Sequence, residues 1–144
     1  MIKLICVGKL KEQYLIDFIN DYKKRINKYH KFEIVELKDS NIKDEGLDIL
    51  KNIKNNEFVV TLEILGNKLS SIDFSKRIDN WLMSYSNITF VIGGSDGIDD
   101  IVKEKSNYSL SFSDMTFPHG VFRGILLEQI YRSFKILNNE SYHK

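Results

Sequence analysis

The chain has 144 residues, of which 42% are hydrophobic and 28% charged, a composition typical of one globular domain spanning residues 1–144. The net charge of +1 argues against a protein that coats nucleic acid by charge alone, and no stretch approaches the roughly 20 apolar residues of a membrane span. The N-terminus lacks the pattern of a signal peptide, and the single cysteine, Cys6, excludes an internal disulfide and is expected to be a buried thiol. These features predict a cytoplasmic protein with no membrane association.

Positive charge is concentrated near the N-terminus. Residues 1–38 hold nine Lys or Arg against five Asp or Glu, whereas residues 39–100 hold six against eleven. Five of the cations fall between Lys23 and Lys31. A basic face and the ordinary solvated surface of a helix are both open interpretations.

Apolar runs alternate with amphipathic segments along the chain. The apolar runs predict strands at residues 2–7, 32–37, 58–62, 88–92 and 108–112. Apolar residues at helical spacing predict helices at 15–29, 45–54, a segment that begins near Ser70 or Ser71, 99–105 and 121–138. Strands that alternate with helices predict an α/β fold, with a mainly parallel sheet covered by helices on both faces.

Ligands of such sheets bind beyond the carboxyl ends of the strands. Three irregular segments, residues 62–66, 93–97 and 110–120, lie at predicted carboxyl ends. We therefore expect them to converge on one pocket.

The segment from Gly93 to Gly97 holds three glycines, which we expect to let a ligand approach bare backbone. It lacks the GxGxxG spacing of a dinucleotide site, and no GK[ST] follows as in a P-loop. A tight turn from strand to helix is the alternative explanation.

The loop at residues 110–120 combines hydroxyl groups that can bind a polar ligand with apolar side chains that suit an adenine ring. The alternative is an ordinary buried strand followed by a proline turn. The hydroxyl residues are Ser111, Ser113 and Thr116, and the apolar residues are Phe112, Met115 and Phe117.

The helix at 121–138 is apolar around nearly its whole circumference, so it must be buried on more than one side, either by a second copy of the chain or inside one domain.

Titratable side chains lie on and near this helix. Glu128 and Arg132 have the i, i+4 spacing of a surface pair, and His119 can brace the helix start. Residues 140–144 would normally fray, although the terminal Tyr-His makes a catalytic tail conceivable. Three widely separated histidines predict no metal site.

Several motifs together resemble a known family. They are Val-Gly-Lys-Leu-Lys at 7–11, Val-Thr-Leu-Glu at 60–63, the glycine segment within 90–97, the serine- and phenylalanine-rich loop at 110–119, Glu-Gln-Ile-Tyr-Arg at 128–132 and Tyr-His-Lys at 142–144. In combination, and over essentially the whole chain, they are similar to the ribosomal large-subunit methyltransferase H family, a minimal branch of the SPOUT superfamily.

The resemblance implies a SPOUT-type α/β fold with a C-terminal trefoil knot. It implies a homodimer that uses S-adenosylmethionine, and no metal, to methylate N3 of the pseudouridine at position 1915 of 23S rRNA in the assembled 70S ribosome. Chemically, an imidazole is a reasonable acceptor for the N3 proton, and an arginine can stabilise the negative charge left on the base.

The resemblance also implies site residues. Cofactor contacts fall on Leu62, Gly93, Phe112, Ser113, Asp114, Met115, Thr116 and Phe117. Catalysis or RNA positioning falls on His119, Arg123, Arg132, Tyr142 and His143.

The chain departs from the family pattern in two places. Residues 38–56 form a shorter segment than in many relatives, and Gly120 and Gly124 stand where bulkier residues are common. Within a helix, Gly124 costs about 1 kcal/mol relative to alanine.

Three other classes of protein compete with the enzyme. One is a non-enzymatic ribosome-associated dimer, and another is a SPOUT enzyme acting on tRNA, which would need an extra RNA-binding segment. The third is a flavodoxin- or receiver-like module, which leaves the terminal Tyr-His unexplained.

Overall fold

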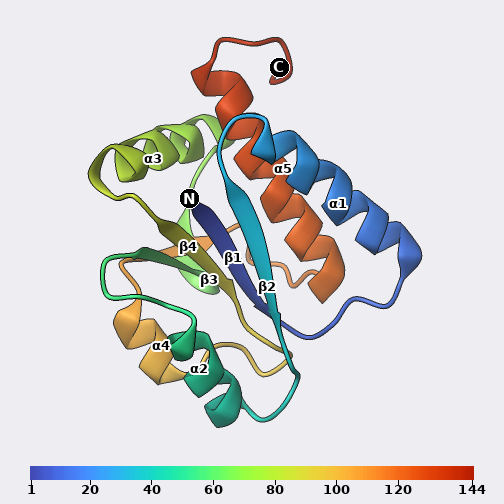
Figure 1. Ribbon diagram of the computed structural model, residues 1–144, viewed down its shortest axis with the longest axis vertical. Coiled ribbons are helices and arrows are strands. Elements are labelled where there is room, and N and C mark those ends of the chain that lie inside the picture. Colours follow the sequence, from blue (N-terminus) through green and yellow to red (C-terminus); the bar gives the residue numbers. More distant parts are fainter.

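The computed structural model describes all 144 residues as a five-stranded parallel sheet with the strand order β2-β1-β4-β3-β5 (Figure 1). The predicted α/β class is confirmed. The strands are β1 (Ile2–Val7), β2 (Phe32–Leu37), β3 (Phe58–Lys68), β4 (Ile88–Ile92) and β5 (Tyr108–Ser111). Three strands have the predicted limits, whereas β3 continues six residues further and β5 ends one residue earlier.

The five helices are α1 (Gln13–Asn27), α2 (Ile42–Lys51), α3 (Ser71–Ser84), α4 (Asp100–Lys105) and α5 (His119–Leu137). Side-chain caps fix three of their starts. Ser70 caps α3, as predicted, by accepting a hydrogen bond from the backbone N–H of Asp73 at 3.1 Å. Asp99 caps α4, and Asn41 caps α2, which therefore begins three residues before the predicted start.

Two hydrophobic cores lie on opposite faces of the sheet. Helices α1, α3 and α5 cover one face, and α2 and α4 cover the other (Figure 1). Alternate residues of β1 serve the two cores: Leu4 and Cys6 face the first, and Ile5 and Val7 the second. Burial raises the pKa of the Cys6 thiol to about 11, so this cysteine is an inert core residue, as predicted.

Helix α5 packs on the sheet between α1 and α3. Leu126, Leu127 and Ile130 are completely buried within one chain. The internal-helix alternative therefore accounts for most of the apolar circumference. What remains is a half-buried stripe along one side of α5, formed by Phe122, Ile125, Gln129, Arg132 and Ile136.

The two helix glycines, Gly120 and Gly124, allow α1 to approach α5 closely. A Cβ atom at Gly124 would lie 2.2 Å from Cε2 of Phe18, and one at Gly120 would lie 2.7 Å from the side chains of Leu10 and Leu15. The low helix propensity of glycine is thus the cost of close packing between the two helices.

No helix combines the length and the apolarity that crossing a membrane requires. The structure also contains no group of three or more His, Cys, Asp or Glu side chains placed to hold a metal ion. The trefoil knot implied by the resemblance is consistent with this fold and stays a prediction.

Replacing Gly124 by alanine should destabilise the protein by about 1–3 kcal/mol, because the new methyl group must displace the ring of Phe18. Urea denaturation measures this cost. In a Phe18→Leu background the same change should cost much less, since the obstructing ring is gone. An equal cost in both backgrounds would contradict the packing argument.

Candidate functional site

A cavity of about 840 Å³ lies at the carboxyl ends of β3, β4 and β5 and beside the start of α5. The three segments predicted to converge, 62–66, 93–97 and 110–120, all contribute to its wall, so this prediction is confirmed. Its volume is in the range of about 300–1,000 Å³ that small-molecule sites occupy.

An irregularity in β3 shapes one side of the cavity. Leu62 and Asn67 both pair with Leu110 of β5, so the residues between them bulge out of the ladder. Ile64 and Leu65 lie on this bulge and line the cavity, with Leu65 96% exposed. The predicted strand stopped at residue 62 because the charged residue Glu63 interrupts the apolar run there.

Seven of the eight predicted cofactor residues line the cavity, and Asp114 does not. The side chain of Asp114 is exposed and pairs with Lys68 at 2.5 Å, because the turn that carries it points toward solvent. Its side chain therefore does not line the cavity, and the contact of Asp114 with the cofactor stays a prediction. The seven lining residues are Leu62, Gly93, Phe112, Ser113, Met115, Thr116 and Phe117.

The glycine segment is crowded by the chain itself. A Cβ atom at Gly93 would lie 2.4 Å from the carbonyl oxygen of Gly97, and one at Gly94 would lie 2.8 Å from Oε1 of Glu45. Gly97 has a φ of +86°, in the left-handed region that glycine tolerates. These contacts support the alternative explanation, a tight turn that folds onto itself and onto α2, and approach of a ligand to the glycine backbone stays a prediction.

The cavity contains one ion pair that sequence reasoning missed, Glu63 with Lys103, separated by 3.7 Å. Burial raises the pKa of Glu63, but hydrogen bonds from Ser109 and Thr61 and the charge of Lys103 outweigh it and hold the pKa below its ordinary value. Glu63 is therefore an ionised carboxylate in a largely apolar wall. Its place directly after the apolar run of β3 was the available sequence signal.

His119 lies in the first turn of α5 and lines the same cavity. Its Nδ1 atom is buried and has no hydrogen-bond partner within the chain. Because a buried polar atom without a partner is costly, this nitrogen is available to a bound molecule.

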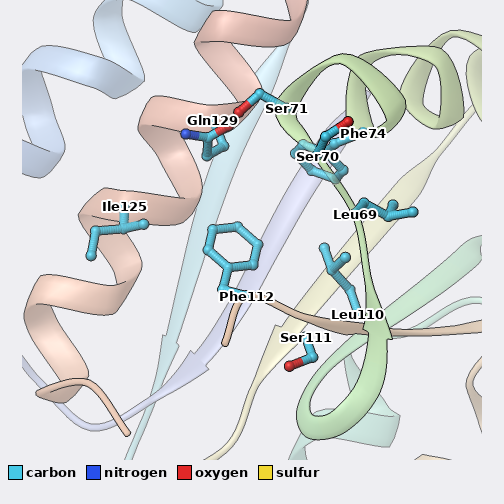
Figure 2. A pocket seen from close by; sticks show the side chains of 9 residues that line it. All are labelled: Leu69, Ser70, Ser71, Phe74, Leu110, Ser111, Phe112, Ile125 and Gln129. Carbon is cyan, nitrogen blue, oxygen red and sulfur yellow. Dashed lines mark hydrogen bonds between the residues drawn. The ribbon is translucent and has the colours of Figure 1, made fainter. Parts of the chain in front are cut away.

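A second, smaller cavity of about 180 Å³ lies between the start of α3 and α5 (Figure 2). Figure 2 shows Ile125 and Gln129 projecting from α5 toward this space, with the ring of Phe112 beside Ile125 and below Gln129. Ser71 donates a hydrogen bond to Gln129 at 2.6 Å. Phe112 borders both cavities, and edge-on contacts with Phe74 and Phe122 fix its ring, so this wall is rigid.

Arg123 lies outside the larger cavity and is only 3% exposed. Its Nη1 contacts the Glu36 carboxylate at 2.8 Å, and its Nη2 donates to the carbonyl oxygens of Val7 and Gly8 at 3.0 and 2.7 Å. These bonds tie α5 to the end of β1. Within one chain Arg123 is thus a positioning residue, and a direct catalytic contact is not supported.

The C-terminal tail folds back, so the expectation that it frays is wrong. Asn139 has a φ of +54° and turns the chain after α5. Glu140 then accepts a hydrogen bond from Tyr29 at 2.8 Å and pairs with Lys135 at 3.0 Å. The ring of Tyr142 packs edge-on against Tyr131, with 4.9 Å between ring centroids.

Arg132 connects the predicted surface pair to the tail. Its Nη2 lies 2.6 Å from Oε1 of Glu128, which confirms the predicted pairing, and its Nη1 lies 3.1 Å from Nδ1 of His143. The hydroxyl of Tyr142 donates to the same Glu128 oxygen at 3.0 Å. Three predicted catalytic residues, Arg132, Tyr142 and His143, therefore form one cluster, which we call the tail cluster.

His119, which lines the cavity, begins α5, and the C-terminal tail follows the other end of this helix (Figure 1). His119 and Arg132 are thirteen residues apart on this helix, or about 20 Å along its axis. One chain does not bring the five predicted catalytic residues together.

Comparison with sequences of known proteins gives consistent matches over the whole chain. A family described as "Predicted SPOUT methyltransferase" matches residues 1–143. The ribosomal RNA large subunit methyltransferase H proteins of Clostridium tetani and of Clostridium botulinum strain Alaska E43 are each 50% identical to this chain, over 99% of both sequences. These alignments span 157 positions, so both relatives carry residues that this chain lacks.

Solved structures share the fold at low sequence identity. A probable methylase family protein from Haemophilus influenzae Rd KW20 matches with a TM-score of 0.61 and 12% identity, over 99% of this chain and 70% of the other. The SpoU methyltransferase AviRb from Streptomyces viridochromogenes, in complex with the cofactor AdoMet, matches with a TM-score of 0.51 and 8% identity. This match covers 90% of this chain and 56% of the other.

The anchor of the tail should depend on pH. The hydrogen bond from Tyr29, and then Lys135, lowers the pKa of Glu140 below its ordinary value of 4.5. A lowered folded-state pKa stabilises the folded tail fully above about pH 4.5, and this contribution is lost as the pH falls through the folded-state pKa. NMR shifts of residues 140–144 should follow that titration in the wild type and not in Glu140→Gln. Tail shifts that stay constant while Glu140 becomes protonated would contradict the anchor.

Proposed function

The chain belongs to the ribosomal RNA large subunit methyltransferase H family of SPOUT methyltransferases, and from this membership we propose that it methylates N3 of pseudouridine 1915 in 23S rRNA, within the assembled ribosome. The methyl donor of the family is S-adenosylmethionine. The observation that carries the proposal is the 840 Å³ cavity at the carboxyl ends of β3, β4 and β5, built from the residues that the family pattern assigns to the cofactor.

The cavity residues fit this cofactor chemically. Phe112, Met115 and Phe117 offer an apolar wall to an adenine ring, and the ionised carboxylate of Glu63 suits a ligand with net positive charge. The partnerless Nδ1 of His119 offers a further polar contact. When bound, the cofactor supplies a methyl group activated by a cationic sulfur.

The chain's own residues supply positioning and charge. His119 lies at the cavity wall, where it can orient the methyl donor, and Arg123 holds the start of α5 in place through the carbonyls at the end of β1. The tail cluster presents a guanidinium and an imidazole, which suit a base that becomes negative when N3 loses its proton. Holding the two reactants in contact can provide much of the rate.

The distance between the two groups supports a homodimer. About 20 Å of buried helix separates the cavity from the tail cluster in one chain, so we propose that the tail of a second copy lies beside the cavity. The half-buried stripe on α5 is the surface we propose for this contact, because it holds Phe122, Ile125 and Ile136 without a complete cover.

The basic N-terminal region supports a substrate of RNA. Lys24, Lys28 and Lys31 are exposed on the last turns of α1 and the segment after it. Tyr29 of the same segment binds the tail through Glu140. The positive charge therefore gathers at the end of the molecule that carries the tail cluster, which suits docking of a phosphate backbone beside it.

Replacing Gly93 by alanine should reduce S-adenosylmethionine affinity by more than tenfold, about 1.4 kcal/mol, because the new methyl group forces the turn away from Gly97. Calorimetric titration measures this loss. Asp96→Ala is the matched control, since Asp96 is exposed in the same turn and does not line the cavity. Unchanged affinity in a folded Gly93→Ala protein would refute this placement of the cofactor.

Deleting residues 142–144 should reduce methylation of ribosomes by roughly 10²–10⁴-fold, because the tail cluster loses the imidazole and the phenol. Cofactor affinity should change little, since no tail residue lines the cavity. Transfer of label from S-adenosylmethionine to ribosomes measures the rate, with isolated tRNA as the competing substrate. Near-full activity would show that the tail has no chemical role, and transfer to tRNA alone would replace the proposed substrate.

Light scattering at micromolar concentration should give a mass of about 34 kDa, twice the 16.9 kDa of one chain. Replacing Ile125 in the α5 stripe by aspartate should shift the mass toward one chain, because a charge would then lie in the interface. A wild-type monomer would refute the dimer.

A further inference from the structure

The direction of one hydrogen bond fixes which ring nitrogen of His143 carries a proton. The guanidinium of Arg132 has only donors, and its Nη1 lies 3.1 Å from Nδ1 of His143. Nδ1 must therefore accept, and the proton of the neutral ring resides on Nε2.

The neighbours of Arg132 keep this direction fixed. Its Nε and Nη2 both donate to Oε1 of Glu128, at 3.0 and 2.6 Å, and this bond raises the pKa of Arg132 above its ordinary value. The guanidinium also lies 4.8 Å from the ring centroid of Tyr142. Arg132 thus remains a cation and a donor throughout the physiological range.

The phenols beside Arg132 are donors as well. Tyr142 donates to Glu128 at 3.0 Å, so Tyr22, 3.1 Å from the Tyr142 oxygen, donates to Tyr142. Burial, with these two hydrogen bonds, raises the pKa of Tyr142 above its ordinary value, so it remains a neutral phenol. The titratable and charged groups around the cluster are Tyr22 and Arg25 on α1, Glu128, Tyr131 and Arg132 on α5, and Tyr142 in the tail.

From this geometry we propose that His143 acts in the methylation as a hydrogen-bond donor, through Nε2–H, to a carbonyl oxygen of the pseudouridine ring, and that it is not the acceptor of the N3 proton. The inference rests on the proposed function, since it assigns a role within that reaction. It differs from the expectation that an imidazole takes the N3 proton.

The reaction balances without a base from the protein. The N3 proton leaves to water, and the negative charge is shared between N3 and the two flanking carbonyl oxygens. The lone pair on N3 forms the new bond to the methyl carbon, and the electron pair of the broken carbon–sulfur bond stays on sulfur. A donor held against one carbonyl oxygen, with the Arg132 cation behind it, stabilises the anion before transfer.

Long-range ¹H–¹⁵N NMR of the free protein tests the tautomer without any substrate. We expect His143 to show the proton on Nε2, and to show a weaker preference for this tautomer in Arg132→Met, which keeps an unbranched stem and removes the donors. A proton on Nδ1 in the wild type would overturn the proposal.

Single-turnover rates on ribosomes between about pH 6 and 9 test the role in catalysis. His143→Gln, whose amide can donate from nearly the position of Nε2, should remain within about tenfold of the wild type. His143→Phe, which keeps a flat ring without a donor, should lose about 10²–10³-fold. In wild type and His143→Gln the rate should rise with pH over the whole range, because solvent takes the proton.

A different pattern would overturn the proposal. If His143→Gln falls as far as His143→Phe, and the wild-type rate levels off above about pH 6.5, where an ordinary imidazole becomes neutral, His143 is the proton acceptor. A wild-type protein that methylates no rRNA would instead overturn the proposed function, and the NMR result would still decide the tautomer.

Discussion

The burial of α5 is the constraint on which the rest of this structure depends. The helix lies between the sheet, α1 and α3, with Leu126, Leu127 and Ile130 completely buried, so it can neither bend toward the cavity nor slide along it. Gly124 brings α1 so close that a single methyl group would clash with Phe18. The helix holds His119 at one end and the tail cluster at the other, about 20 Å apart along its axis, and this separation is the basis for the proposed site shared between two chains.

The cavity and the tail cluster have complementary character. The cavity is mostly apolar, with the ionised Glu63 and its loose partner Lys103 as its charged pair, which suits a cofactor that combines an aromatic ring with positive charge. The tail cluster is a polar network around Glu128 and Arg132, which suits a base that becomes an anion. In the proposed dimer, one chain would bind the cofactor and the other would stabilise the substrate anion.

Sequence patterns predicted the features that periodicity and motif chemistry control. The limits of β1, β2 and β4, the Ser70 cap of α3 and the convergence of three loops on one pocket all followed from local signals. Features that depend on side-chain direction or on contacts between distant segments were missed. Asp114 turns toward Lys68, and Arg123 turns back to β1. The tail is held in part by contacts of Glu140 with Tyr29, after α1, and with Lys135, on α5. No spacing rule contains those contacts.

Activity of mixed dimers tests the central claim, a site shared between two chains, most directly. One partner carries Gly93→Ala in the cavity and the other lacks residues 142–144, and neither forms an active dimer with itself at low cofactor concentration. Because random exchange makes half of the dimers mixed, each with one intact pairing of cavity and tail, the mixture should recover about a quarter of wild-type methylation. A mixture that stays as inactive as its two components would show that each chain uses its own tail and would contradict the shared site.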